Sequence, residues 1–185
     1  MPTQADPTPA AAAPVVPRIG TERLVLREFR VSDLDDYAAH FADPIAMTHL
    51  GGVVDRRTAW RMLAAGSGFW MLTGGGWLGM ELRETGRLVG TVGAFFRECS
   101  PELELGWTVY RPHWGKGFAT EAARAALAFA FDAHPVDHAI AHVDAANVAS
   151  IRVTEKLGMR YDGEGELYGL KSGRYVAPRS GKGAR

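Results

Sequence analysis

Two glycines separated by one residue lie where the sequence changes from a strand pattern to a helix pattern. The predicted strand ends at Tyr110, and Gly115, Lys116 and Gly117 open a long apolar helix pattern that runs to Ala133. Glycine adopts backbone conformations closed to other residues and lets backbone N–H groups approach a ligand. The first turn of a helix adds N–H groups without acceptors and the positive end of the helix dipole. This segment therefore predicts a binding site for a phosphate group.

Three other interpretations of this turn are weaker. A P-loop needs Ser or Thr directly after Gly-Lys and a glycine five residues before the lysine, whereas Gly117 and Arg111 occupy those positions. A dinucleotide-binding fingerprint starting at Gly115 would have Thr120 in place of its third glycine, and it needs a parallel sheet. A helix cap without a ligand explains either glycine alone, but not the succession of strand, turn and helix.

The turn resembles the pyrophosphate-binding signature of the GNAT acetyltransferases, (Gln/Arg)-x-x-Gly-x-(Gly/Ala), which is matched by Trp114-Gly-Lys-Gly-Phe-Ala119. At the first position of the signature, this chain has Trp114 in place of Gln or Arg. In this respect the chain is similar to the branch of the family that acetylates ribosomal-protein N-termini. The signature of that branch, Trp-Gly-Lys-Gly-(Tyr/Phe)-Ala-Thr-Glu-Ala, is matched from Trp114 to Ala122. Thr21–Arg27 resembles the opening strand of the branch, and Asn147–Gly158 resembles its Asn-x-x-Ser helix that ends in Leu-Gly.

The resemblance covers the chain from about Thr21 to about Tyr175 and implies acetyl-CoA as co-substrate, without a metal. The N–H groups that it assigns to the pyrophosphate belong to Gly115, Lys116, Gly117, Phe118, Ala119 and Thr120. The backbone groups that it assigns to the pantetheine arm, as an added strand, belong to Thr108, Val109 and Tyr110. It also implies that Asn147 hydrogen-bonds pantetheine and that Ser150 lies near the sulfur. As an alternative, Asn147 is an ordinary helix N-cap.

Acetyl transfer to an amine requires a base, because an α-amine titrates near ~8 and a lysine near ~10.4. Glu104 is the candidate, two residues before Gly106 on the strand that would hold the co-substrate. The alternative is that Glu104 is a solvent-facing strand carboxylate, and Glu102 is an equally charged neighbour on the same face.

The leaving thiolate needs little help, since a free thiol has a pKa near ~8.5. Many GNAT proteins have a tyrosine seven residues after the Asn, and here that position is Thr154. Ser150, acting directly or through a water, is the candidate acid, and the alternative is a hydroxyl that bonds the helix cap. The backbone N–H of Val109 is a candidate to stabilise the oxyanion.

The leading function is therefore an N-acetyltransferase that acetylates a primary amine, either a protein N-terminus or a small molecule, by direct attack in a ternary complex. The alternative is a non-catalytic acyl-CoA-binding or sensor module on the same fold. A dinucleotide-dependent oxidoreductase is disfavoured by the expected sheet. The resemblance also allows a homodimer.

The elements that must position these residues are predicted from hydrophobic periodicity. Strands are expected over 23–29, 77–84, 87–96, 102–110, 138–143, 159–161, 166–170 and 174–176. Helices are expected over 34–41, 55–65, 115–133 and 147–157. The fold class is α+β, with a GNAT-like, largely antiparallel central sheet of about six to seven strands flanked by about four helices. The resemblance adds a splay between the fourth and fifth strands.

Composition limits the possible classes of protein. The 185 residues suffice for one domain, predicted over 19–177, between a Pro/Ala-rich flexible tail (1–18) and a basic flexible tail (178–185). The 21 Lys and Arg balance the 21 Asp and Glu, so no global field favours nucleic acid or a membrane. A single cysteine, Cys99, excludes an intramolecular disulfide, and no export signal or membrane span is expected. These features predict a cytoplasmic protein.

Overall fold

A computed structural model describes residues 16–98 and 100–179. Cys99 and the predicted tail segments 1–15 and 180–185 lie outside the described residues. The strands are β1 (Ile19–Gly20), β2 (Leu24–Arg27), β3 (Gly76–Leu82), β4 (Leu88–Phe96), β5 (Leu103–Val109), β6 (His138–Val143), β7 (Arg160–Leu167) and β8 (Leu170–Pro178). The α-helices are α1 (Leu34–Phe41), α2 (Arg56–Thr73), α3 (Phe118–Ala133) and α4 (Val148–Lys156), and short 3₁₀ turns cover Val31–Asp33 and Arg111–His113.

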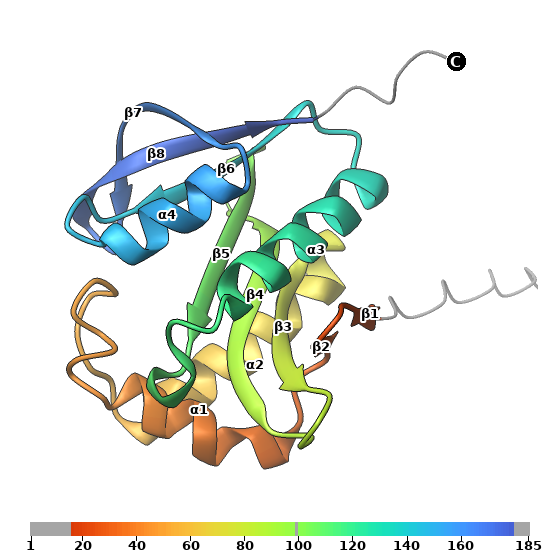
Figure 1. The fold of residues 1–185 in the computed structure, drawn as a ribbon, viewed down its shortest axis with the longest axis vertical. Coiled ribbons are helices and arrows are strands. Elements are labelled where there is room, and N and C mark those ends of the chain that lie inside the picture. The colour runs from red at the N-terminus through yellow and green to blue at the C-terminus, as the bar shows by residue number, and fades with distance from the viewer. Residues whose placement is uncertain (1–15, 99, 180–185) are drawn as a thin grey trace, which may run out of the picture.

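The eight strands form one sheet in the order β1-β2-β3-β4-β5-β6-β8-β7 (Figure 1). Every neighbouring pair is antiparallel except β5 and β6, which are parallel and pair only at Leu103↔Ala139 and Glu104↔Ile140. Beyond Glu104 the two strands diverge. The predicted α+β class and the splay between the fourth and fifth predicted strands are therefore confirmed, and the sheet has one or two more strands than expected.

The helices cover both faces of the sheet. Figure 1 shows α3 on one face and α2 on the other. Helix α3 presents small residues at a spacing of four, Ala122, Ala126 and Ala130, which are fully or almost fully buried, and the helix packs mainly on strands β4 and β5. Small side chains let the helix backbone approach the sheet closely. This brings the first turn of α3 to the divergent end of β5.

A second, smaller core lies on the opposite face, between α1, α2 and the loop that joins them. Beneath it the buried guanidinium of Arg27 bonds Asp33 with two nitrogens, at 2.7 and 2.9 Å, and Glu81 with a third, at 2.5 Å. A buried cation needs such partners to offset its lost hydration. Arg27 thereby joins β2 and β3 to the start of α1.

Several predicted boundaries differ from those observed. Helix α3 starts at Phe118 rather than Gly115, because both preceding glycines are left-handed, and α2 continues to Thr73. The predicted strand 166–170 is wrong: Tyr168 (φ 53°) and Gly169 (φ 76°) form a two-residue turn between β7 and β8. Positive φ at both central positions matches the twist of a hairpin.

The ends of the described chain differ slightly from the predicted domain. Pro178 pairs with His138, and Arg179 donates from its backbone to Asp137 and from its side chain to Val136 and His134. The fold therefore continues two residues into the predicted basic tail. None of the helices in the described ranges is both long and apolar enough to cross a membrane.

Candidate active site

Two cavities meet at the point where β5 and β6 diverge. A cleft of about 770 Å³ runs from the turn before α3 between the end of β5 and helix α4. A cavity of about 270 Å³ lies between the sheet and helices α1 and α2. We call them the donor cleft and the acceptor cavity. Both are lined by His49, Leu50, Trp107, Thr108, Asn147 and Ser150.

The turn before α3 presents a row of free amides. Gly115 (φ 74°) and Gly117 (φ 80°) are left-handed, and Gly117 is the N-cap of the helix without a side-chain cap. Within the described part of the chain, the amides of Gly115, Lys116 and Gly117 donate to no acceptor. The next three amides belong to the first helical turn, where no intrahelical acceptor exists. This arrangement fits an anion such as a diphosphate.

Long-range bonds hold this turn in place. Glu121 in the first turn of α3 accepts from Thr21 Oγ1 (2.6 Å) and from Arg23 Nε (2.7 Å). Arg23 also donates to the carbonyl of Lys116 (2.8 Å). The opening segment and the glycine turn, which are almost 100 residues apart, are therefore joined, and this role of Thr21, Arg23 and Glu121 was not predicted.

Most of the residues predicted for the pyrophosphate line the donor cleft. These are Gly115, Gly117, Phe118, Ala119 and Thr120. The side chain of Phe118 is itself buried in the core, so it contributes its backbone. Lys116 is exposed and does not line the cleft, which instead has the cations Arg152 and Lys156 of α4 along its wall.

At alternate residues of β5, the backbone N–H and C=O groups point away from β4. Tyr110 N–H donates to Val89 O (2.9 Å), and Thr108 is paired with Thr91. In an antiparallel ladder, residues bonded to the partner strand alternate with residues whose N–H and C=O point away. The backbone groups of Thr108 and Tyr110 are therefore committed to β4, and their predicted role in an added strand does not hold.

Trp107 and Val109 have the open orientation instead. They precede and follow Thr108, so their backbone groups face the gap between β5 and β6. The Val109 carbonyl accepts from the indole Nε1 of Trp114 (2.6 Å), which ties the turn to the strand. The Val109 N–H faces the same gap and stays a candidate oxyanion donor, and Trp107 is a residue that the sequence did not indicate.

Tyr110 and His40 form a buried support under the site. Their rings stack at 4.6 Å, and His40 Nε2 bonds Thr108 Oγ1 at 2.9 Å. Burial lowers the pKa of His40 to about 4, so its imidazole is neutral at pH 7. His40 fixes the Thr108 side chain where the two cavities meet.

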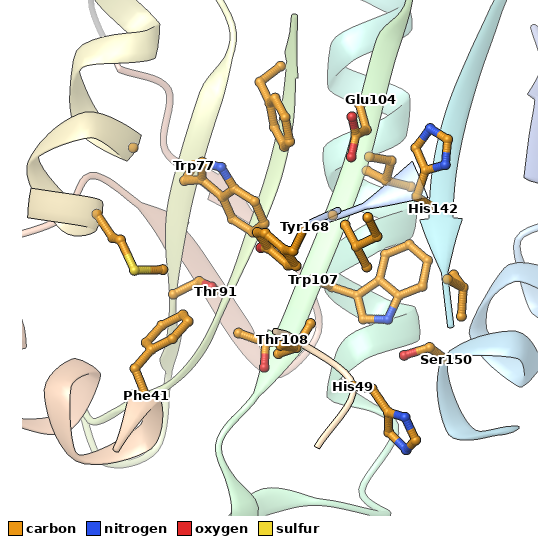
Figure 2. A pocket seen from close by; sticks show the side chains of 18 of the residues that line it. Phe41, His49, Trp77, Thr91, Glu104, Trp107, Thr108, His142, Ser150 and Tyr168 are labelled. Atoms are coloured by element: carbon orange, nitrogen blue, oxygen red, sulfur yellow. The ribbon is translucent and has the colours of Figure 1, made fainter. Parts of the chain in front are cut away.

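Helix α4 brings Asn147 and Ser150 to the same junction. Asn147 Oδ1 accepts from the Ser150 N–H (3.0 Å), so Asn147 is a helix N-cap, and its side-chain NH₂ remains as a donor at the cleft. The Ser150 hydroxyl, which Figure 2 shows near Trp107, has no partner among the described residues. Thr154 is fully buried, donates to Ile151 O (2.7 Å) and lines neither cavity.

The two candidate carboxylates are now distinguished by position. Glu104 is buried, lines the acceptor cavity, and accepts from two nitrogens of Arg97, with Nη2 at 2.7 Å from Oε1 (Figure 2). Glu102 bonds His138 (3.0 Å) and Arg174 and lines neither cavity. Of these two carboxylates, Glu104 is the one at the acceptor cavity.

Other polar residues of the site were not predicted. His49 Nδ1 bonds Asp144 Oδ2 at 2.6 Å across the gap between the α1–α2 loop and the end of β6. The Ala146 amide and His49 hold the pKa of Asp144 below its usual range. Tyr168, from the β7–β8 turn, also lines the acceptor cavity, and the residue is 58% exposed.

These features define a class of protein. An open strand edge and free amides suit a long donor arm with a diphosphate, and a second cavity with a buried carboxylate suits an acceptor. This is the arrangement of a transferase that carries a group from one bound substrate to another. No group of three or more His, Cys, Asp or Glu suited to a metal occurs in the described residues.

Comparisons with known proteins give the family. The acetyltransferase (GNAT) domain matches residues 23–160. The uncharacterized protein YkkB of Bacillus subtilis (strain 168) is 32% identical over 155 residues, which cover 78% of this chain and 86% of YkkB. The chain therefore belongs to the GNAT acetyltransferase family, and the resemblance inferred from the sequence is confirmed.

Solved structures agree with this assignment. The acetyltransferase from Agrobacterium tumefaciens str. C58 has a TM-score of 0.80 and 31% identity, over 88% of this chain and 95% of that one. RimL, a ribosomal L7/L12 alpha-N-protein acetyltransferase, has a TM-score of 0.74 at 12% identity, over 88% of this chain and 94% of RimL. At that identity the likeness to RimL shows the fold alone.

Proposed function

We propose that this chain transfers the acetyl group of acetyl-CoA to a primary amine by direct attack in a ternary complex. The observation that carries the proposal is the meeting of the two cavities beside Thr108 and Ser150. The free amides lie at the far end of one cavity, and the carboxylate of Glu104 lines the other. A donor and an acceptor can therefore be bound together, so no covalent enzyme intermediate is required.

The donor is held by backbone groups along most of its length. The amides of Gly115, Gly117 and the first turn of α3 bind the diphosphate, helped by the positive end of the helix dipole. The pantetheine arm pairs with the open backbone groups of Trp107, like an added strand. The Asn147 NH₂ donates to the same arm from the opposite wall. The thioester then lies beside Ser150.

The reaction needs a neutral amine. Glu104 takes a proton from the ammonium, directly or through a water, and Arg97 orients its two oxygens. The nitrogen lone pair forms the N–C bond, and the carbonyl oxygen becomes an oxyanion that the Val109 N–H stabilises. When the C–S bond breaks, the electron pair leaves with sulfur. The second proton of the attacking nitrogen then passes to the thiolate through the Ser150 hydroxyl, which accepts one proton and donates one.

A non-catalytic acyl-CoA-binding module remains the second candidate. Two observations favour it: both oxygens of Glu104 already accept from Arg97, and a buried Thr154 stands where many relatives have a tyrosine. Such a module would bind acetyl-CoA in the same cleft and transfer nothing.

Calorimetry with CoA and turnover of acetyl-CoA over a panel of amines separate these functions. We expect saturable CoA binding, and Glu104→Gln should lower kcat by about 100-fold or more while leaving CoA affinity unchanged. Ser150→Ala should lower kcat less. Glu102→Gln is the matched control and should retain activity, because Glu102 lines neither cavity.

Each outcome has a distinct meaning. Binding without turnover of any amine would support the binding module. Wild-type turnover in Glu104→Gln would remove Glu104 as the base. Absence of CoA binding up to millimolar concentration would refute both functions.

A further inference from the structure

The acceptor cavity has a flat aromatic floor. Trp77, Gly93 and Gly106 stand in register on strands β3, β4 and β5, and the Trp77 indole lies across the two glycines. A Cβ added at Gly93 or Gly106 would lie 2.8 or 2.7 Å from indole atoms. Phe95 stacks against the same indole at 5.2 Å. The sheet therefore supports one large aromatic surface, with no competing side chain beneath it.

The roof of the cavity is also aromatic. Tyr168 and Trp107 line the cavity together with Trp77, and Figure 2 shows Trp107 on the side of β5 that faces Ser150. Tyr168 has φ 53°, a conformation that a bulky residue rarely adopts and that clusters at ligand-binding sites. A Cβ added at Gly51 would lie 3.3 Å from Tyr168 Cβ. The β7–β8 turn thus meets the α1–α2 loop beside the acceptor cavity.

The charged groups that line the cavity are already paired with each other. Glu104 is bonded by Arg97, and Asp144 is bonded by His49. The second histidine of the lining, His142, contacts Ser172 Oγ at 3.4 Å. A ligand with several ammonium groups would need several free carboxylates in such a site, because each unpaired buried charge is costly. Glu104 and Asp144 are the carboxylates that line the cavity, so a single ammonium would share Glu104 with Arg97 and a second one would find no free carboxylate there.

The acceptor cavity is small. Sites for drug-sized ligands span about 300–1,000 Å³. At about 270 Å³, the acceptor cavity has room for the amino group of an acceptor and one small ring system.

From these observations we propose that the acceptor is a small aromatic monoamine, whose ring stacks on Trp77 under Tyr168 and whose amino group faces Glu104. This inference rests on the proposed acetyltransferase function and specifies its substrate class. Stacked aromatic pairs contribute about 0.5–1.5 kcal/mol beyond area burial, which is a discrimination of up to about tenfold for each contact.

The first test compares amines at saturating acetyl-CoA. 2-Phenylethylamine and tryptamine should have a kcat/KM at least about tenfold above cyclohexylethylamine, spermidine, kanamycin and a hexapeptide with a free N-terminus. If spermidine, kanamycin or the hexapeptide had the highest kcat/KM, this inference would be overturned, and the acetyltransferase function would still stand. Failure of the proposed function itself would be seen as no turnover of any amine.

Two variants test the geometry. Trp77→Ala should raise KM for 2-phenylethylamine about tenfold, and Trp60→Ala is the matched control, because Trp60 is an exposed tryptophan outside the cavity. Tyr168→Gly suits the left-handed backbone, so folding is preserved. This variant should raise KM for 2-phenylethylamine and lower KM for the hexapeptide. Unchanged KM for the aromatic amine in both variants would refute the proposed pocket.

Discussion

Gly106 shows how a missing side chain shapes the site. It lies on β5 between Glu104 and Thr108, two residues of the same sheet face that line the acceptor cavity. Its hydrogen atom is the only substituent that leaves room for the Trp77 ring. The position of the aromatic floor, and so the depth at which an amine meets Glu104, depends on that space.

Gly106→Ala should therefore destabilise the fold by about 1–3 kcal/mol, because the new Cβ would stand 2.7 Å from the indole and overpack it. Urea denaturation measures the change. Gly68→Ala in α2 is the matched control, since nothing lies within 4 Å of its added Cβ and alanine favours a helix. Equal stability of the two variants would show that Trp77 does not press on Gly106.

His40 gives the fold a pH dependence of known sign. Its pKa is about 4 in the folded state because of burial, below the ordinary 6.5, although Asp43 acts to raise it. Below pH 6.5 the unfolded chain binds a proton that the fold excludes, so this contribution to stability falls until about pH 4. The full change is about 3 kcal/mol.

We expect the His40→Gln variant to lack this pH-dependent contribution to the free energy of unfolding, while its carboxylates titrate as in the wild type. Denaturation from pH 7 to pH 4 should show a steeper loss of unfolding free energy in the wild type than in the variant. Parallel curves would mean that His40 is charged or exposed in the folded protein.

At the scale of elements, the start of α3 combines two roles in one turn. Gly117 serves as N-cap without any side-chain acceptor, so the first amides of the helix stay free. Arg23 and Glu121 replace the missing local cap with contacts between β2 and α3. The helix end is stabilised from outside the cleft, and its inner side is left for a ligand.

Gly117→Ala should weaken acetyl-CoA binding by about tenfold, since alanine in a left-handed conformation costs about 1–2 kcal/mol and would shift the amides. Calorimetry measures the affinity. Gly86→Ala, in the β3–β4 turn, has a similar φ of 69° and open surroundings. It should cost stability and leave affinity unchanged, and a comparable loss of affinity in both variants would argue against a specific role of the turn.

At the scale of the whole molecule, the sheet consists of two parts that pair at only two positions. Strands β1 to β5 carry α1, α2 and α3, and β6 to β8 accompany α4 (Figure 1). The donor cleft has walls from both parts. A bound donor would therefore replace the missing strand pairing and join them.

Acetyl-CoA at about 100 times its Kd should stabilise the protein by about 2.7 kcal/mol, which corresponds to a rise in Tm of about 5–10 °C for a chain of this length. Hydrogen exchange should slow at the end of β5 and the start of α4. A pantetheine fragment without the diphosphate should give a smaller rise, and an equal rise would contradict the role of the turn before α3.

Local patterns explain which parts of this fold were predictable. The bounds of β6 agree with its alternating sequence, and α4 begins after Asn147 and ends before Gly158, as expected from its cap and stop signals. Each of these features depends on residues a few positions apart. The glycine turn before α3 was predictable for the same reason.

The features that were missed depend on contacts between distant segments. Alternate residues of β5 look equivalent in sequence. The register with β4 decides that the backbone groups of Trp107 and Val109, not those of Thr108 and Tyr110, face the gap between β5 and β6. The turn at Tyr168 lies inside an apparent strand.

By itself, the sequence determined the family, the order of the elements and the anion-binding turn. Each of these depends on residues that are close together in the sequence, so no knowledge of contacts with distant segments is needed. The tertiary structure alone decided which carboxylate lines a cavity, which backbone groups are free and what closes the acceptor pocket. Glu104 is distinguished from Glu102 by Arg97 and by the position of Trp77. These features depend on packing between segments that are far apart in the sequence, and the local sequence does not show which distant segments lie close together.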